Sequence, residues 1–319
     1  MRILVTGGAG YIGATAVDVL ISQGFDVSIL DDLSTGHLDA VHPSASFIEG
    51  SLLDNSSLGQ ALRNCDAVMH FGGKSLVGES VEKPDLYWNV NVLGTRALLD
   101  EMQKQSITQL VFSSSAATYG APTEMPISEL AQAKPTNPYG VTKLAIDEMI
   151  AQQSSNFGLS AISLRYFNVA GALESLRGWI SERHNPETHL IPNLLKSTDS
   201  SPVKIFGTDW PTPDGTAIRD YVHVVDLVEA HITALKVLEK GKHTIINLGS
   251  GRGYSVREVL NSASSYLSRP IPHVDTTRRS GDPVSLIADI SRAKEVLAWV
   301  PRRDISSMVA DTANSLEIA

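Results

Sequence analysis

Residues 3–13 read Ile-Leu-Val-Thr-Gly-Gly-Ala-Gly-Tyr-Ile-Gly, an apolar run followed by a glycine-rich loop. The run Ile3–Thr6 predicts a strand, and a helical pattern at Ile12–Gln23 follows the loop directly. Glycines at this junction let the backbone turn sharply and approach a pyrophosphate, which lies against the helix N-terminus because free N–H groups there favour anions. A glycine turn without a ligand is the alternative, but the order strand, loop, helix favours a dinucleotide-binding loop.

A second predicted strand, Val27–Leu30, ends at the acidic pair Asp31 and Asp32. Asp31 follows the glycine loop at roughly the spacing, about 20 residues, of the acidic residue that holds the adenosine ribose in dinucleotide sites. A carboxylate in this place accepts hydrogen bonds from the ribose hydroxyls and repels a 2′-phosphate. Asp31 therefore favours NAD over NADP as the cofactor, the alternative being that it only caps a turn.

Apolar, partly β-branched runs alternate with helical patterns through the first half of the chain. The runs lack strict alternation, as strands buried on both faces do, and the alternation of strands with helices favours a parallel sheet. The predicted strands are Ile3–Thr6, Val27–Leu30, Ala67–Phe71, Leu110–Ser113 and Ala161–Arg165, and the predicted helices are Ile12–Gln23, Asn91–Gln105 and Pro138–Asn156. We predict an α/β fold whose first domain, residues 1–166, is a Rossmann-like, doubly wound parallel sheet that binds NAD.

The character of the sequence changes from about Phe167, where the predicted strands shorten, the loops lengthen and prolines become frequent. We predict a smaller C-terminal α/β substrate domain over residues 167–319. Some of its strands and helices are expected to interleave with the first domain.

The composition is that of an ordinary globular protein, with 42% hydrophobic and 19% charged residues. The 26 basic residues are outnumbered by 35 acidic ones, which argues against a nucleic-acid partner. Cys65 is the only cysteine, so we expect no disulfide and no thiolate metal cluster, and no motif in the sequence indicates a metal site. The chain opens directly on a strand pattern and has no apolar run of about 18 residues, so we expect no signal peptide, no membrane partner and a cytoplasmic location.

A Tyr-x-x-x-Lys spacing, Tyr139 and Lys143, follows Pro138, a residue that favours the first position of a helix. Positions i and i+4 lie on one helix face, so the phenol and the ammonium point into the same space. A nearby cation and a positive nicotinamide favour the phenolate, bringing the pKa of Tyr139 from about 10 toward neutrality. Ser113–Ser115 end the preceding strand at the edge where open α/β sheets bind ligands. The spacing is common by chance, but with the glycine loop and the serines it predicts a proton-transfer site.

The glycine loop, Ser115 and the Tyr139/Lys143 pair resemble those of the extended short-chain dehydrogenase/reductase superfamily. More specifically, nearly the whole chain is similar to UDP-glucose (UDP-galactose) 4-epimerases. The stretch from Phe206 to His223 is close to diagnostic of these epimerases, whereas the glycine loop is common to the superfamily. The matching segments are His70–Gly73, Val77–Ser80, Phe112–Ser115, Tyr119–Gly120, Asn137–Gly140, Arg165–Asn168, His189–Pro192, Ile205–Thr212, Asp214–Thr216, Arg219–His223, Asn247–Gly249 and Arg278–Asp282.

The resemblance implies an NAD-dependent isomerase that inverts C4 of a UDP-hexose through a 4-keto intermediate. It implies that Ser115 orients the sugar 4-hydroxyl, that Tyr139 takes its proton, and that Lys143 holds the nicotinamide ribose and lowers the pKa of the tyrosine. The implied NAD-binding residues are Gly7, Gly10, Tyr11, Ile12, Gly13, Asp31, Ser51, Leu52, Phe71, Asn91, Ser113, Tyr139, Lys143 and Tyr166. The implied UDP-hexose-binding residues are Ser115, Tyr139, Asn168, His189, Leu190, Phe206, Arg219, Arg279 and Asp282.

Related enzymes and a protein without activity are the alternatives. Sugar-nucleotide 4,6-dehydratases place an Asp-Glu pair directly after the serine or threonine position, where this chain has Ala116 and Ala117. The glutamate of UDP-glucuronate decarboxylases is missing as well. A non-catalytic NAD-binding protein on this fold often lacks the tyrosine or the lysine, and both are present. Activity as a UDP-N-acetylhexosamine 4-epimerase remains an alternative, because Leu286 stands where a tyrosine narrows the hexose pocket in this family.

Two further expectations come from the resemblance. Ser51 stands where the family usually has an aspartate that binds the adenine amino group, so how tightly NAD is retained stays open. The family also implies a homodimer built from two helices of each subunit, here Asn91–Gln105 and Pro138–Asn156. Both helices carry apolar residues that suit such an interface and suit a core equally well, namely Val92, Leu98, Leu99, Ile146, Met149 and Ile150.

Overall fold

The computed structural model describes residues 1–279 and 281–318, so Ser280 of the Arg278–Asp282 motif lies outside the described residues. The central feature of the protein is a seven-stranded sheet in the order β12-β6-β5-β4-β1-β2-β3, with every neighbouring pair parallel. The strand bounds are β1 (Arg2–Thr6), β2 (Asp26–Asp31), β3 (Ser46–Glu49), β4 (Ala67–His70), β5 (Gln109–Ser115), β6 (Ser160–Tyr166) and β12 (His243–Leu248). The predicted Rossmann-like sheet is confirmed.

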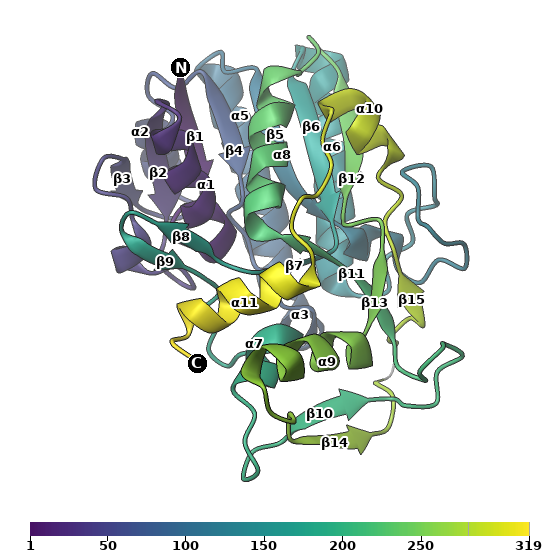
Figure 1. The fold of residues 1–319 in the computed structure, drawn as a ribbon. Coiled ribbons are helices and arrows are strands. Elements are labelled where there is room, and N and C mark those ends of the chain that lie inside the picture. Colours follow the sequence, from purple (N-terminus) through teal and green to yellow (C-terminus); the bar gives the residue numbers. More distant parts are fainter. Residues whose placement is uncertain (280, 319) are drawn as a thin grey trace.

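Helices cover both faces of this sheet, which explains why its strands lack an alternating pattern (Figure 1). Within β1, Ile3 and Val5 belong to one core cluster, whereas Leu4 belongs to the cluster on the other face. The first cluster contains residues of α1 (Tyr11–Ser22), α8 (Val224–Lys236) and α10 (Ser291–Leu297). The second contains residues of α2 (Asn55–Ala61), α5 (Gly94–Lys104) and α6 (Pro138–Phe157).

The segment before α5 differs from the single helix predicted over residues 91–105. Two short helices, α3 (Val77–Glu82) and α4 (Pro84–Tyr87), lead into a π-helix, η2 (Trp88–Leu93), and α5 begins only at Gly94. π-helical turns are rare and are found frequently at functional sites. The wider turn holds Asn91 in the interior, where it is 1% exposed.

Helix α6 begins at Pro138, as predicted, and its N-terminus is well defined. The side chain of Asn137 accepts a hydrogen bond from the backbone N–H of Gly140 at 2.9 Å, which satisfies one of the free donors of the first turn. Gly158 ends the helix in the left-handed conformation, with φ of 74°. Tyr139 and Lys143 therefore lie in the first two turns of a long, capped helix.

The apolar residues of α5 and α6 face inward. Val92, Leu98, Leu99, Ile146 and Ile150 are at most 7% exposed, and Met149 packs against the same core cluster. A helix on an α/β sheet must bury one face against that sheet, and these residues form that face. They therefore give no support to a dimer interface.

A second unit lies below the carboxyl ends of the parallel strands in Figure 1. A third core cluster holds it together, with residues from all three of its helices. Its helices are α7 (Leu190–Leu195), α9 (Val256–Leu267) and α11 (Ile305–Ser315). Its strands are β7 (Asn168–Ala170), β8 (Leu173–Ser175), β9 (Gly178–Ile180), β10 (Val203–Phe206), β11 (Ile218–His223), β13 (Gly253–Ser255), β14 (His273–Thr276) and β15 (Ser285–Leu286).

Between these two units the chain crosses more than once. After residue 167 it returns to the large sheet in α8, β12 and α10, and β12 pairs in parallel with β6. We propose two interleaved domains that divide first at residues 166 and 167. Short 3-10 turns, η1 (Leu38–Ala40) and η3 (Ala116–Tyr119), complete the elements. Within the described residues, no helix has both the length and the apolar character that a membrane span requires.

Candidate active site

The glycine loop between β1 and α1 has no room for a side chain at Gly7 or Gly13. Gly7 has φ of 69°, and a Cβ there would lie 2.8 Å from the backbone nitrogen of Gly72. A Cβ on Gly13 would lie 2.0 Å from the carbonyl oxygen of Gly7. Gly10 precedes α1 and caps it without a side chain, so the first N–H groups of the helix stay open to an anion. The loop fits the pyrophosphate of a dinucleotide.

Asp31 lies at the end of β2 beside this loop. Its Oδ2 accepts a hydrogen bond from the backbone N–H of Ala9 at 3.0 Å, and its Oδ1 accepts one from Leu33 at 2.9 Å. Each carboxylate oxygen keeps a second lone pair, so a ribose hydroxyl can still bind. Burial raises the pKa of Asp31, while the two N–H groups lower it. The structure shows the turn-capping contacts, and binding of the ribose by Asp31 stays a prediction.

The predicted catalytic trio comes together where β5 and α6 meet. Lys143 is 5% exposed, and its Nζ donates a hydrogen bond to the carbonyl oxygen of Ser113 at 2.7 Å. The same Nζ lies 5.8 Å from the centroid of the Tyr139 ring. Ser115 is close enough for its side chain to lower the pKa of Tyr139 by a hydrogen bond. The phenol, the ammonium and the hydroxyl thus occupy one small volume, as the spacing predicts.

The electrostatics of this trio differ from the expectation. Burial raises the pKa of Tyr139, and the Ser115 hydrogen bond offsets only part of this effect. Burial also lowers the pKa of Lys143, to about 8, although the carboxylate of Asp147 raises it. Lys143 is therefore a weaker cation than a free lysine and does not by itself activate the phenol. The remaining positive charge must come from a bound group, and a nicotinamide carries one.

Asn91 connects this trio to the loop after β4. Its Oδ1 accepts a hydrogen bond from the backbone N–H of Lys74 at 2.7 Å, and its Nδ2 donates to the Oγ1 of Thr142 at 3.0 Å. Thr142 in turn donates to the carbonyl oxygen of Tyr139 at 2.7 Å. Asn91 therefore positions the catalytic helix, and Lys74 and Thr142 are members of the site that the sequence did not reveal.

A buried chain of hydrogen bonds also links Asn91 to the glycine loop. The Oγ1 of Thr6 contacts Nδ1 of His70 at 2.6 Å, and Nε2 of His70 contacts the Oγ1 of Thr95 at 2.9 Å. Thr95 donates its own proton to the carbonyl oxygen of Asn91 at 2.6 Å, so it accepts the proton of His70 Nε2. Burial lowers the pKa of His70 to about 3, which keeps the ring neutral.

The other predicted NAD-binding residues lie around these groups. Tyr166 contacts the Oγ of Ser113 through its hydroxyl, and the ring of Phe71 lies 4.7 Å from that of His231, centroid to centroid. Leu52 is buried. The Oγ of Ser51 accepts a hydrogen bond from the backbone N–H of Leu53 at 3.2 Å, so it caps its own turn while remaining half-buried.

Four of the predicted UDP-binding residues, Phe206, Arg219, Arg279 and Asp282, lie on β10, β11 and the loop before β15. An Nη of Arg219 lies 3.6 Å from an oxygen of Asp282, and the guanidinium carbon of Arg279 lies 3.8 Å from the centroid of the Phe206 ring. Burial lowers the pKa of Arg219, and the charge of Arg279 lowers it further. Two neighbouring arginines suit a diphosphate or another anion, and binding of UDP here stays a prediction. Phe206 is covered by a guanidinium and is no simple core residue.

The structure gives less support to three of the predicted UDP-binding residues. Asn168, exposed on β7, donates a side-chain hydrogen bond that lowers the pKa of Tyr221. Nδ1 of His189 lies 2.8 Å from Oε1 of Glu187, and Leu190 begins α7. These three lie in the second unit with the arginines, but no contact joins them to Arg219 or Arg279 among the described residues.

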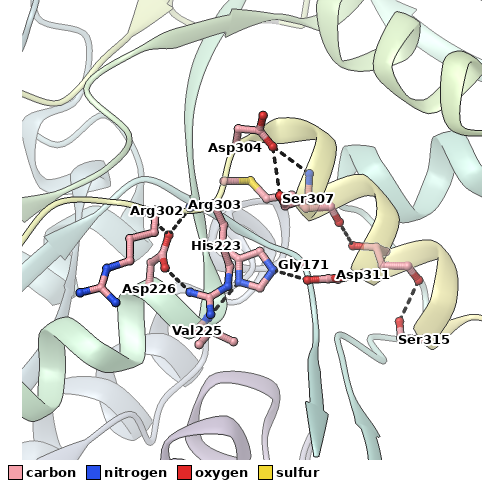
Figure 2. Close-up of polar contacts among 12 residues, drawn as sticks. Gly171, His223, Val225, Asp226, Arg302, Arg303, Asp304, Ser307, Asp311 and Ser315 are labelled. Carbon is pink, nitrogen blue, oxygen red and sulfur yellow. Dashed lines mark hydrogen bonds and ion pairs between the residues drawn. The ribbon is translucent and has the colours of Figure 1, made fainter.

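Figure 2 shows a polar cluster that holds the second unit against the first. Nε2 of His223 lies 3.0 Å from Oδ2 of Asp311 on α11, and Nδ1 accepts a hydrogen bond from the backbone N–H of Val225, so the proton is on Nε2. Gly171 packs on this ring so tightly that a Cβ would lie 2.3 Å from Nε2. The carbonyl oxygen of Gly171 accepts a hydrogen bond from the hydroxyl of Tyr11 at 2.6 Å. The cluster therefore fixes Tyr11 beside the glycine loop.

The geometry brings a loop that fits a dinucleotide close to a half-buried phenol, Tyr139, and places a pair of arginines, Arg219 and Arg279, in the second unit. The residues that fit NAD are those of the glycine loop, Asp31 and Lys143. A half-buried phenol that hydrogen-bonds a serine can exchange a proton with a hydroxyl of a bound substrate. Ala116 and Ala117, which follow Ser115, offer no further acid or base.

Comparisons with known proteins agree with this geometry. A family model described as the NAD dependent epimerase/dehydratase family matches residues 3–249. The chain is 49% identical over 314 residues to a UDP-glucose 4-epimerase of Corynebacterium glutamicum, covering 98% of this chain and 94% of the relative. A crystal structure of UDP-glucose 4-epimerase from Brucella ovis in complex with NAD matches with a TM-score of 0.95 and 40% identity, covering 100% of this chain and 99% of that one. The enzyme from Bifidobacterium longum in complex with NAD+ and UDP matches with a TM-score of 0.92 and 34% identity, covering 99% and 98%. The chain belongs to the NAD dependent epimerase/dehydratase family.

Proposed function

We propose that this chain is an NAD-dependent isomerase that interconverts UDP-glucose and UDP-galactose by inverting C4 of the hexose. The observation that carries the proposal is the trio of half-buried Ser115, half-buried Tyr139 and buried Lys143 beside a cradle that fits a dinucleotide. Relatives that are similar along nearly the whole chain are UDP-glucose 4-epimerases, and solved ones contain NAD or UDP. Elimination and decarboxylation are disfavoured because Ala116 and Ala117 offer no acid or base.

Each residue of the proposed site has a separate role in the reaction. The glycine loop, Asp31 and Lys143 would hold NAD, which would supply a reversible hydride acceptor for C4, so that the sugar would undergo no net oxidation. The hydroxyl oxygen of Tyr139 takes the proton of the 4-hydroxyl and gives it back, while Ser115 orients that hydroxyl. Lys143 holds the cofactor ribose, and Asn91 keeps the helix of Tyr139 in register with the loop at Lys74. Inversion requires that the 4-keto sugar turns over before C4 is reduced from the other face.

This requirement explains why the substrate is held at its nucleotide end. Arg219 and Arg279 are proposed to bind the diphosphate or nucleoside, with Phe206 as a wall for the uracil. Asn168, His189, Leu190 and Asp282 complete the proposed UDP site. Charged contacts at this end keep the substrate bound while the hexose itself is held loosely enough to rotate.

A homodimer and a cytoplasmic location belong to the same proposal. The apolar faces of α5 and α6 that point inward cannot form the interface, but Trp88 and Leu93 of η2 and Val141 of α6 are 42–47% exposed. An apolar surface of this kind on neighbouring helices is suited to contact with a second copy. Light scattering at micromolar concentration should give the mass of two chains, and the mass of one chain would exclude the dimer.

Incubation with UDP-galactose tests the activity. Purified protein with NAD but without added reductant should produce UDP-glucose, which nuclear magnetic resonance identifies by its C4 configuration. NADH absorbance should not grow in step with product, because each turnover restores the cofactor. Stoichiometric NADH would identify a dehydrogenase instead, and an unchanged substrate would reject the proposal.

A further inference from the structure

The segment between β9 and α7 carries a Glu-x-His pattern twice in succession, Glu182-Arg183-His184 and Glu187-Thr188-His189. The two repeats fold alike. Oε1 of Glu182 accepts hydrogen bonds from the backbone N–H groups of Arg183 and His184 and contacts Nδ1 of His184. Oε1 of Glu187 accepts from the backbone N–H groups of Thr188 and His189 and lies 2.8 Å from Nδ1 of His189. Each glutamate thus fixes the ring of the histidine two residues later.

This arrangement leaves Nε2 of His189 available, whereas in His184 the nitrogen that faces Glu182 is Nδ1, so an ion shared by Glu182 and His184 would lie between these two atoms. When a carboxylate binds Nδ1 of a histidine, it sets the tautomer and makes Nε2 the electron-pair donor, which is how histidines that bind metals are commonly oriented. The rings of His184 and His189 lie 5.5 Å apart, centroid to centroid, with their planes at 46°. A tetrahedral metal with metal–nitrogen distances of about 2.0–2.1 Å holds two imidazole centroids about 5 Å apart. The two rings are therefore near the separation that one shared ion requires.

A third donor lies beside the two imidazoles. One ligand atom each from Glu182, His184 and His189 can be chosen such that all three lie within 4.8 Å of one another. The side chains of Glu182 and His184 are 14% and 22% exposed, whereas that of His189 is 42% exposed, so the group is sheltered on one side and open on the other. Two imidazole nitrogens and one carboxylate oxygen favour Zn²⁺ and similar transition metals over Mg²⁺ or Ca²⁺, which prefer oxygen ligands alone.

The surroundings favour a cation as well. Glu182 and Glu187 lie near the buried hydroxyl of Tyr11, and their charges raise its pKa. Two Glu–His hydrogen bonds with neutral rings are the competing interpretation, because an Nδ1–H group donates to a carboxylate without an ion. A divalent ion neutralises the same two carboxylates with neutral rings.

We propose that Glu182, His184 and His189 bind one divalent transition-metal ion of the zinc class, with Glu187 orienting His189. Three protein ligands leave a fourth position, which is open to water or to an oxygen of another ligand. Such an ion fixes the segment between β9 and α7 and stands next to Tyr11 at the glycine loop. His189 is also one of the proposed UDP-binding residues, so the metal site is tested by a readout that uses no epimerase activity.

Cobalt titration of the metal-free, full-length protein tests the site without using activity. We expect one Co²⁺ per chain, the visible absorption bands of a four-coordinate site, and loss of these bands when Zn²⁺ is added. Glu187→Gln should weaken binding by about 10-fold, because it removes an orienting partner and no ligand. His184→Ala and His189→Ala should weaken binding more than this and abolish the bands. His273→Ala, which removes an exposed histidine on β14, is the matched control and should change nothing.

The result that overturns the proposal is equally specific. It fails if the wild type binds no Co²⁺ with such bands, or if His184→Ala binds it with unchanged stoichiometry and affinity. Circular dichroism and thermal melting identify a variant that does not fold, and the conservative Glu182→Gln then replaces it as the ligand variant. Because the readout is an absorption spectrum, an inactive epimerase with a cobalt spectrum would reject the proposed function and keep the metal site.

Discussion

The reacting end of the site, with Ser115, Tyr139 and Lys143, differs in construction from the UDP end around Arg219 and Arg279. At the reacting end the polar atoms are buried and hydrogen-bonded to the chain itself, as Lys143 is to the carbonyl of Ser113. At the UDP end the charged groups make looser contacts, such as the 3.6 Å pair of Arg219 with Asp282 and the stacking of exposed Arg279 on Phe206.

The difference has a functional meaning. A reaction step depends on geometry that is in place before the substrate arrives, and a group held by its own protein provides it. A binding contact can instead form when the substrate arrives. Arg219 and Arg279 then exchange their present, weaker partners for the oxygens of a diphosphate. We therefore expect substitutions at the reacting end to change kcat and substitutions at the UDP end to change KM.

Tyr139→Phe is the most severe test of this comparison. The variant keeps the ring and its packing against Tyr87, which lies 6.4 Å away edge to face, but removes the proton acceptor. We expect kcat to fall by about 10²–10⁴-fold, the usual contribution of a positioned acid or base, with little change in the affinity for UDP. Steady-state kinetics and UDP titration measure both values. Near-normal turnover would show that another group takes the proton.

Arg279→Met tests the UDP end. Methionine keeps much of the length over Phe206 but cannot bind an anion. We expect KM for UDP-galactose to rise by about 10–100-fold and kcat to change far less, as for the loss of one hydrogen bond between charged groups. The control is Arg278→Met, because Arg278 stacks on Trp210 at 4.1 Å and pairs with Asp209. The assignment is wrong if the control raises KM as much as Arg279→Met does.

His70 tests the reacting end through the stability of the protein and not through kinetics. It is 1% exposed behind the reacting end, and burial lowers its pKa to about 3. The unfolded chain binds a proton near pH 6.5 but the folded chain does not, so acidification below this pH favours unfolding. We expect the cofactor-free wild type to lose up to about 2 kcal/mol more than His70→Gln between pH 7 and pH 5. Urea unfolding at both pH values measures it, and equal losses would mean that His70 does not stay neutral.

Of these substitutions, Leu286→Tyr is expected to change the kinetics least. It tests the hexose pocket between the reacting end and the UDP end. Leu286 lies half-buried on β15, in register with Arg219 of β11. A leucine leaves more room than a tyrosine for an N-acetyl group on the hexose, so we expect secondary activity on UDP-N-acetylglucosamine. The tyrosine should lower kcat/KM for acetylated relative to plain substrate by about 10-fold, as for a few atoms excluded from a pocket. An unchanged ratio would show that Leu286 does not limit the pocket.

The sequence predicted the reacting end well because its signals are local. The glycine loop is one continuous turn, and Tyr139 and Lys143 are four residues apart on a single helix, so neither depends on long-range packing. Asp31 ends a strand that is parallel to β1, so the βαβ pattern alone places it near the glycines.

The other features of the site could not be predicted, because they depend on contacts between residues that are distant in the sequence. The π-helix at Trp88–Leu93 holds Asn91 against Thr142 and Lys74, and nothing in its local sequence distinguishes it from an α-helix. The pairing of His223 with Asp311 joins residues 88 positions apart. The electrostatic expectation for Tyr139 was incomplete for the same reason, because the burial that raises its pKa and lowers that of Lys143 comes from the whole fold.

UDP-galactose that carries deuterium at C4 tests the central claim most directly, because the account requires the same hydrogen to leave C4 and return to it. The protein is incubated with this substrate in ordinary water, and mass spectrometry with nuclear magnetic resonance measures the deuterium at C4 of the UDP-glucose formed. The account predicts that the product keeps its deuterium while the configuration inverts. Product that contains solvent hydrogen at C4 would contradict it, since the hydrogen would then have left as a proton to water and would never have been held for return.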